Sequence, residues 1–175
     1  VFLFIERYLY IRKTAKLDEN FLHTINDMLQ AGNVQGAINF CKATSFPIAK
    51  LLEKGLSRLG SPIRDIEAAI ENKAKVEIYN MEKNLGILSA IARIAPMFGF
   101  LGTIVGMVQL FYGIASTGEY TLNTIAGGIY TKMITSATGL IIGLIAYVGY
   151  NFLSTQIDKT ANKMEVASSE FIDIL

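Results

Sequence analysis

The sequence predicts an all-α membrane protein with three transmembrane helices, the first of them truncated at the N-terminus. Of the 175 residues, 51% are hydrophobic and only 18% are charged, whereas a typical soluble domain has about 25% charged residues. The charges are also unevenly placed, because residues 94–157 contain only Glu119 and Lys132. A stretch of that length with so little charge excludes an ordinary soluble domain.

Two apolar segments are long enough to cross a membrane. Residues 94–115 and 133–153 contain no charged side chain, and a hydrocarbon core of about 30 Å requires roughly 20 such residues. The opening run VFLFIERYLYIRK is typical of the last turns of a spanning helix, and no basic region precedes it as in a signal peptide. The predicted order is the end of a first transmembrane helix (1–13), a cytoplasmic helical domain (14–90), a second transmembrane helix (91–115), a short periplasmic loop (116–124), a third transmembrane helix (125–153) and a cytoplasmic C-terminal helix (154–175).

The basic residues predict the orientation of these segments. Lys and Arg residues follow the first span and precede the second, whereas the loop STGEYTLN between the second and third spans has none. Because basic residues are enriched in cytoplasmic loops, residues 14–90 and the C-terminus are expected in the cytoplasm.

The charged part of the chain is expected to be helical throughout. Apolar residues recur with helical spacing over 18–31, Asn33 is placed to cap a second helix, and Pro47 suits the first turn of a third. From about residue 62 to about 114 the pattern continues without a stop, which predicts one helix leading into the second span. Residues 154–172 are expected to prolong the third span as an amphipathic helix, with an apolar residue about every seven positions: Ile157, Met164 and Phe171.

Small residues in the two apolar segments predict a helix–helix interface. The runs GFLGTIVG and GLIIG place glycines at helical spacing, which lets two backbones approach closely. A proline inside the second span removes one helical hydrogen bond and is expected to bend it. The candidate packing and kink residues are Pro96, Gly99, Gly102, Gly106, Gly139 and Gly143.

Hydroxyl side chains form a polar face on the third span, and two interpretations of it remain open. Either the hydroxyls bond to backbone carbonyls and hold helices together, or the face lines a hydrated path. The candidate pathway residues are Thr103, Thr131, Thr135, Ser136 and Thr138. Lys132, close to the outer end, and Arg93, at the inner end, are candidates for charge tuning and for reaching the membrane surface.

Neither complete span contains a carboxylate, since Glu119 is in the loop. If protons cross here, a titratable carrier therefore has to come from a partner helix. Chemistry of other kinds has little support in the sequence. The one histidine, His23, is in the charged domain, and Cys41 alone provides neither a disulfide nor a cysteine-based metal site within one chain. No enzyme activity, metal or cofactor is expected.

Two segments carry a resemblance to a known family. The runs ARIAPMFGFLGTIVGM (92–107) and GGIYTKMITSATGLIIGLIAYVGYNFL (127–153) resemble the MotA/TolQ/ExbB proton-channel family, and within it ExbB most of all. The resemblance implies a homopentamer in the bacterial inner membrane, with an ExbD-like single-span partner that supplies an Asp, and a TonB-like protein that carries the energy to outer-membrane transporters. Two features depart from the family pattern: Thr131 occupies the position of a frequent Glu, and Lys132 is unexpected beside it.

Other functions remain alternatives to an ExbB-like motor subunit. A TolQ-like or a gliding- or secretion-type motor stator has the same layout, and a non-conducting helical membrane scaffold needs only the packing role of the hydroxyls. A neighbouring gene for a short protein with one transmembrane span that contains an Asp would favour the motor subunit over the scaffold.

Overall fold

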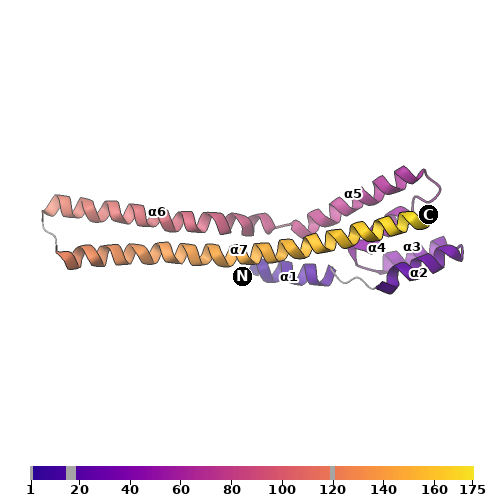
Figure 1. Cartoon of the computed structure of the whole chain (residues 1–175), viewed down its shortest axis with the longest axis horizontal. Helices are drawn as coiled ribbons and strands as arrows, with labels where there is room; N and C mark the ends of the chain where they lie inside the picture. Colours follow the sequence, from indigo (N-terminus) through magenta and orange to yellow (C-terminus); the bar gives the residue numbers. More distant parts are fainter. Residues whose placement is uncertain (1, 15–18, 119–120) are drawn as a thin grey trace. The chain divides into compact units, whose positions relative to one another are not determined.

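The computed structural model describes residues 2–14, 19–118 and 121–175, and within them every regular element is a helix. The all-α prediction is therefore confirmed (Figure 1). The chain divides into two compact units, residues 1–83 with 153–175 and residues 84–152, so the longest helix belongs to both. The helices are α1 (Phe2–Thr14), α2 (Glu19–Gln30), α3 (Val34–Ala43), α4 (Pro47–Leu56), α5 (Ile63–Glu82), α6 (Leu85–Thr117) and α7 (Leu122–Ile174).

Short local signals set the ends of the first helices of unit 1. Gly32 has a left-handed φ of 73°, which ends the α2 segment as predicted. The side chain of Asn33 accepts a hydrogen bond of 2.9 Å from the backbone N–H of Gly36, so Asn33 caps α3. Pro47 occupies the first turn of α4, where its missing N–H costs nothing. These three predictions are confirmed.

The C-terminal part of α7 contributes to the core of unit 1. Gly55 on α4 allows close packing there, because a Cβ at this position would lie 2.8 Å from both Ile70 Cδ1 on α5 and Phe171 Cε1 on α7. The apolar repeat predicted for residues 154–172 is buried, with exposed fractions of 1–2%. The core side chains include Ile25, Leu51, Leu52, Leu56, Ile70, Met81, Leu153, Ile157, Met164 and Phe171.

A buried carboxylate joins α4 to α5. Glu77 is 3% exposed and pairs with Lys50 of α4 at 3.0 Å and with Lys73, one turn earlier on α5, at 2.9 Å. Burial raises the pKa of Glu77, but the hydrogen bonds from the two lysines outweigh it, so the pKa is lowered overall. The nearby Cys41 thiol is also buried, and burial, with a smaller contribution from Glu53, raises its pKa to about 12.

The single helix predicted from about residue 62 to about 114 is wrong, because the chain leaves the helical conformation between α5 and α6. Lys83 is extended (ψ 133°) and Asn84 has a left-handed φ of 68°. Asparagine tolerates this conformation better than most residues with a side chain. The apolar periodicity gave no sign of the break, since apolar residues resume at Leu85 at once.

The break coincides with a contact from α1. The guanidinium of Arg7 is buried and donates a 3.2 Å hydrogen bond from Nη1 to the carbonyl oxygen of Asn80, in the last turn of α5. A basic side chain thus donates a hydrogen bond to one of the carbonyl oxygens that the end of a helix leaves unpaired. Arg7 also pairs with Glu6 and lies 5.0 Å from the centroid of the Tyr10 ring. The assignment of residues 1–13 to the end of a transmembrane helix stays a prediction.

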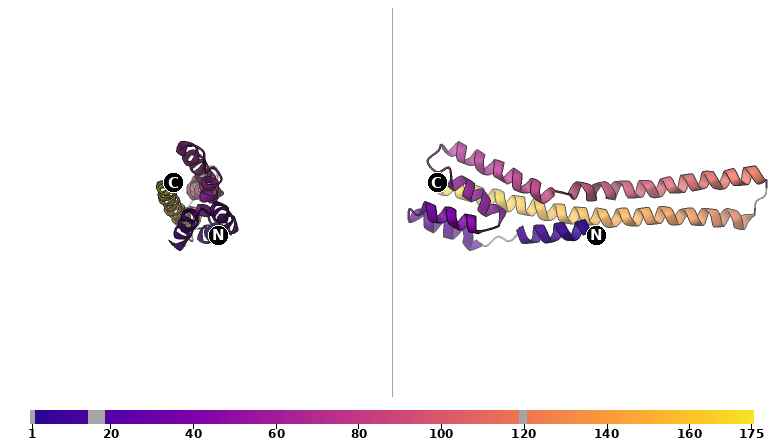
Figure 2. Two further views of the ribbon diagram at one scale, coloured as in Figure 1. Left: turned by 90° about the vertical axis from the view of Figure 1, so that its right-hand side faces the viewer. Right: turned by 180° about the vertical axis from the view of Figure 1, so that it is seen from behind.

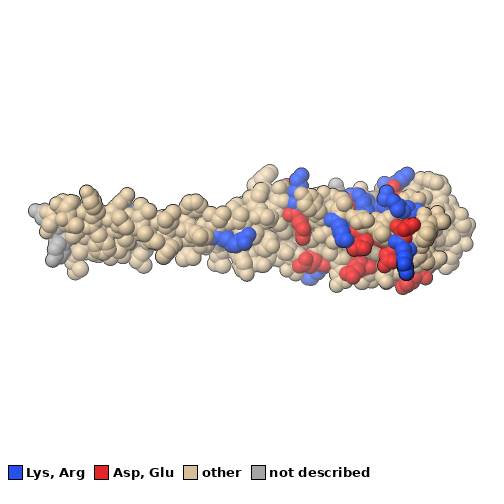
Figure 3. All heavy atoms as spheres, turned by 90° about the horizontal axis from the view of Figure 1, so that it is seen from above, with Lys and Arg blue, Asp and Glu red and all other residues tan. Residues whose placement is uncertain are grey.

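Unit 2 is a hairpin in which α6 runs antiparallel to the first part of α7, side by side in both views (Figures 1 and 2). Leu85–Thr117 and Ile125–Ile174 are each long and apolar enough to contain a membrane span. The face in Figure 3 shows charged side chains gathered over unit 1 and a nearly uncharged hairpin surface. Large apolar side chains such as Phe98, Phe100, Val108, Ile141 and Leu144 are exposed on the hairpin, which fits an environment of lipid or partner helices.

Candidate functional site in the helical hairpin

Glycines set the register between α6 and α7. A Cβ on Gly139 would lie 2.7 Å from the Ala95 carbonyl oxygen and 2.8 Å from Gly99 Cα. A Cβ on Gly143 would lie 2.5 Å from Pro96 Cγ. Because these contacts are too short for a side chain, the two backbones approach as closely as they do only with glycine at these positions.

The same register continues towards the loop. A Cβ on Gly99 would lie 3.1 Å from the Ser136 carbonyl oxygen, and one on Gly102 would lie 2.9 Å from Thr135 Cγ2. Further along, Gly128 lies against Leu110, whose Cδ1 would be 2.7 Å from an added Cβ. The face that α7 turns to α6 thus includes Ser136, Gly139 and Gly143, with the Thr135 methyl at its edge.

The other predicted hydroxyls lie away from this contact. Thr131 and Thr138 are exposed, and each donates a 2.9 Å hydrogen bond to the carbonyl oxygen four residues earlier. Thr103 is half-buried and donates to the carbonyl oxygens of Gly99 and Phe100, at 3.1 and 2.8 Å. Each of these hydroxyls has used its own hydrogen, and its lone pairs remain as acceptors.

Thr103 also lines a shallow, open apolar groove on α6. Its other lining residues are Phe100, Ile104, Met107, Val108 and Phe111. The structure of one chain therefore does not bring the five predicted pathway hydroxyls together. Thr135 and Ser136 meet the glycines of α6, whereas Thr103, Thr131 and Thr138 are on other surfaces of the hairpin.

The two candidate charge-tuning residues differ in their surroundings. Arg93 is exposed, and its Nε donates a 3.4 Å hydrogen bond to the Ser89 carbonyl oxygen in the preceding turn. Lys132 is half-buried and its aliphatic stem lies on Gly106, where an added Cβ would overlap Cδ and Cε of the lysine. Gly106 therefore provides the space for the Lys132 stem, a role that the pattern GFLGTIVG did not distinguish from general helix packing.

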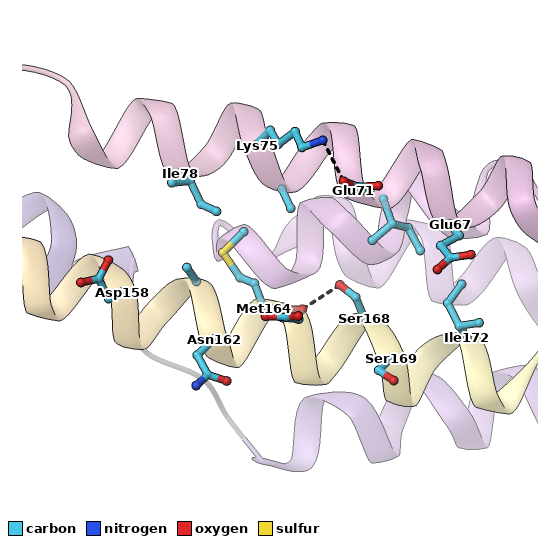
Figure 4. A pocket seen from close by; sticks show the side chains of 14 residues that line it. Glu67, Glu71, Lys75, Ile78, Asp158, Asn162, Met164, Ser168, Ser169 and Ile172 are labelled. Atoms are coloured by element: carbon cyan, nitrogen blue, oxygen red, sulfur yellow. Dashed lines mark hydrogen bonds and ion pairs between the residues drawn. The ribbon is translucent and has the colours of Figure 1, made fainter.

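A second open groove, which the sequence did not predict, runs along unit 1 between α5 and α7 (Figure 4). Four acidic residues and one lysine line it among apolar side chains: Glu67, Glu71, Asp158, Glu165 and Lys75. Lys75 pairs with Glu71 at 2.7 Å, and this hydrogen bond lowers the pKa of Glu71. Sequence periodicity places acids on each helix, but the groove depends on how α5 and α7 pack.

Within the described residues, no group of three or more His, Cys, Asp or Glu side chains is placed to hold a metal ion. The hairpin and its two apolar helices define the class of the protein, an all-α membrane protein with its charge concentrated in a helical unit outside the hairpin.

Comparison with known proteins places the chain in a family within that class. Residues 43–166 match the model of the MotA/TolQ/ExbB proton channel family. Since the match spans more than half of the chain and contains the whole hairpin, the chain belongs to this family, as the sequence motifs predicted.

Individual relatives carry ExbB and TolQ names. The chain is 27% identical to an ExbB homologue of Methanothermobacter thermautotrophicus over 93% of this chain and 58% of the relative. It is 38% identical to the biopolymer transport protein exbB1 of Vibrio cholerae over 50% of this chain and 39% of that protein. It is 31% identical to the Tol-Pal system protein TolQ of Haemophilus influenzae over 55% of this chain and 41% of that protein. The chain thus spans less than two thirds of the length of these relatives.

Proposed function

We propose that the chain is an ExbB-like subunit of an inner-membrane proton channel and motor. With an ExbD-like single-span partner, it converts the proton motive force into work on a TonB-like protein for outer-membrane transport. The observation that carries this proposal is a hairpin rich in hydroxyls, residues 84–152, whose sequence has no acid except Glu119. Such a hairpin needs a carboxylate from another chain to conduct protons. Membership of the proton-channel family supports a channel in which this chain supplies the hydroxyls and a partner supplies the acid.

In this proposal the hydroxyls of Thr103, Thr131, Thr135, Ser136 and Thr138 line the route past the partner's carboxyl group. A hydroxyl that donates to its own helix accepts a hydrogen bond from water or from a protonated carboxyl group. It therefore stabilises the partner's acid in its neutral form as that acid passes through the apolar region. Several copies of the hairpin are needed to enclose such a route, since the hydroxyls of one hairpin point to different surfaces.

The assembly we propose is a homopentamer, with residues 14–90 and the C-terminus in the cytoplasm. The charge distribution supports this orientation, because 14 of the 16 Lys and Arg residues belong to unit 1. Open grooves on both sides of the α7 end support oligomerisation. One is the acidic groove beside α5, and the other, beside α2, is lined by residues of both charges, Lys159, Lys163, Glu170 and Asp173.

Proton flux into proteoliposomes that hold the chain and its partner tests the proposed route. We expect Thr103→Val and Ser136→Ala each to lower the flux about 10-fold, because a lost hydrogen bond of about 1.4 kcal/mol corresponds to a factor of ten in rate. Assembly should be unchanged. Thr160→Val is the matched control, because Thr160 donates to its own helix at Gln156 in unit 1. Full flux in both hairpin variants contradicts the route.

A non-conducting scaffold is the second candidate, and the hydrogen bonds of Thr103, Thr131 and Thr138 to their own helix favour it. These hydroxyls are satisfied without water. A scaffold predicts no proton flux in the wild-type complex, above that of empty vesicles, under an imposed pH gradient.

A further inference from the structure

Lys132 has an unusual position in the hairpin. It is the one basic residue in the sequence from 94 to 157, and its stem lies on Gly106 of α6. Gly106 is buried, and any side chain there would displace the lysine. The lysine is therefore held against the other helix along its length and is not a freely moving surface chain.

The contact with Gly106 also shows where the Lys132 side chain lies along the charge-free segment of α6. Gly106 is about 18 Å from the beginning and about 14 Å from the end of the charge-free segment 94–115, at 1.5 Å per residue. The stem of Lys132 is thus near the middle of the second span. The sequence placed Lys132 close to the outer end because the charge-free run of the third span begins only at residue 133. At that distance from the ends of the charge-free segment, a lysine side chain is too short for its ammonium to reach the membrane surface by extending along the helix.

An ammonium group at this position in the apolar segment is costly unless it is paired, and an opposite charge is the strongest partner available to it. The residues one helical turn away are neutral: Leu110 follows Gly106 on α6, and Thr135 and Ser136 follow Lys132 on α7. A second copy of the chain adds only Glu119 between residues 94 and 157, and Glu119 is 13 residues from both Gly106 and Lys132 in the sequence. Anionic lipid headgroups are at the membrane surface. The remaining source is a carboxylate carried within the membrane by a different protein.

We propose that Lys132, seated on Gly106, binds the intramembrane carboxylate of the partner helix and positions it opposite Gly106 of α6. The proposal deepens the proposed function, since both require a partner with such a carboxylate. Ser136 follows Lys132 by one helical turn, on the same face of α7. Lys132 is here a positioning residue that selects an acidic partner helix over a neutral or basic one.

Zero-length cross-linking tests this contact in native membranes. Dicyclohexylcarbodiimide adds to a protonated carboxyl group, the neutral Lys132 amine attacks the activated acyl carbon, and an amide forms while dicyclohexylurea leaves. We expect a cross-linked peptide that joins Lys132 to an Asp or Glu within an apolar segment of another protein. Lys132→Met and Lys132→Arg should both lack this peptide. Cross-links to a second copy of the chain or to phosphatidylserine overturn the proposal.

A second measurement keeps the proposal testable if the reagent does not reach the site. Tagged chain is purified from native membranes, and the co-purified single-span protein is quantified. We expect Lys132→Glu to reduce its amount at least about 10-fold, because it places like charges together at low dielectric. Lys132→Arg should retain the partner, and Lys54→Met, at an exposed position in the last turn of α4, is the control. Restoration of binding when Lys132→Glu is combined with replacement of the partner's acid by Lys supports the ion pair.

The result separates the inference from the proposed function. Undiminished partner binding by Lys132→Glu overturns the inference, even where proton flux is intact. A cross-link from Lys132 to a partner acid in a complex without proton flux supports the inference and contradicts the proposed function.

Discussion

Gly139 offers a direct test of the close approach between α6 and α7. An alanine Cβ at this position would lie 2.7 Å from the Ala95 carbonyl oxygen and 2.8 Å from Gly99 Cα, and both are backbone atoms that no rotamer change can move. Gly139→Ala therefore requires the two helices to separate. Overpacking of this kind costs about 1–3 kcal/mol, and the higher helix propensity of alanine offsets about 0.8–1 kcal/mol of it.

The control is the same substitution on the same helix. A Cβ on Gly127 of α7 meets nothing within 4 Å, so Gly127→Ala carries only the gain in helix propensity. We expect the free energy of unfolding of Gly139→Ala to fall below that of Gly127→Ala by about 1–3 kcal/mol.

The assay is the midpoint of thermal unfolding of detergent-solubilised protein, read from the soluble fraction after heating. For a chain of this size, 1 kcal/mol corresponds to about 2–4 °C. Gly139→Ala should thus melt several degrees below Gly127→Ala. Equal midpoints for the two variants mean that α6 and α7 do not pack through glycine at this point, and the register described above is then wrong.

Two further predictions concern unit 1. At neutral pH, alkylation of Cys41 measures both, since this buried thiol reacts only when the unit opens. The pH dependence of the second is read from the midpoint of thermal unfolding, because a thiol carries almost no reactive thiolate below pH 4.5. Arg7→Leu leaves the Asn80 carbonyl unpaired and should lower the free energy of opening by about 1–3 kcal/mol; unchanged alkylation contradicts a role in closing α5. Glu77→Gln should lower the free energy of opening of unit 1 by a similar amount at neutral pH. Because the folded pKa of Glu77 is lowered, its contribution is present above the ordinary value of 4.5 and is lost as pH falls through the folded pKa. The gap between wild type and Glu77→Gln should therefore narrow below pH 4.5, and a gap independent of pH excludes ionised Glu77 as its source.

The sequence by itself determined the features that depend on neighbouring residues. Charge-free runs of sufficient length located the apolar helices, and Asn33 and Pro47 marked helix starts because capping is a local interaction. The spacing of Ile157, Met164 and Phe171 predicted a buried stripe, since helix geometry alone puts these side chains on one face. The motifs of the two spans led to the family.

Only the tertiary structure decided which surfaces those faces meet. Periodicity continued through Asn84, so the break between α5 and α6 was invisible until the backbone and the bond from Arg7 to Asn80 were seen. The depth of Lys132 depended on its pairing with Gly106 of α6. A hydrophobic pattern reports that a face is covered but carries no information on the register of its partner, because that register is set by contacts between residues far apart in the chain.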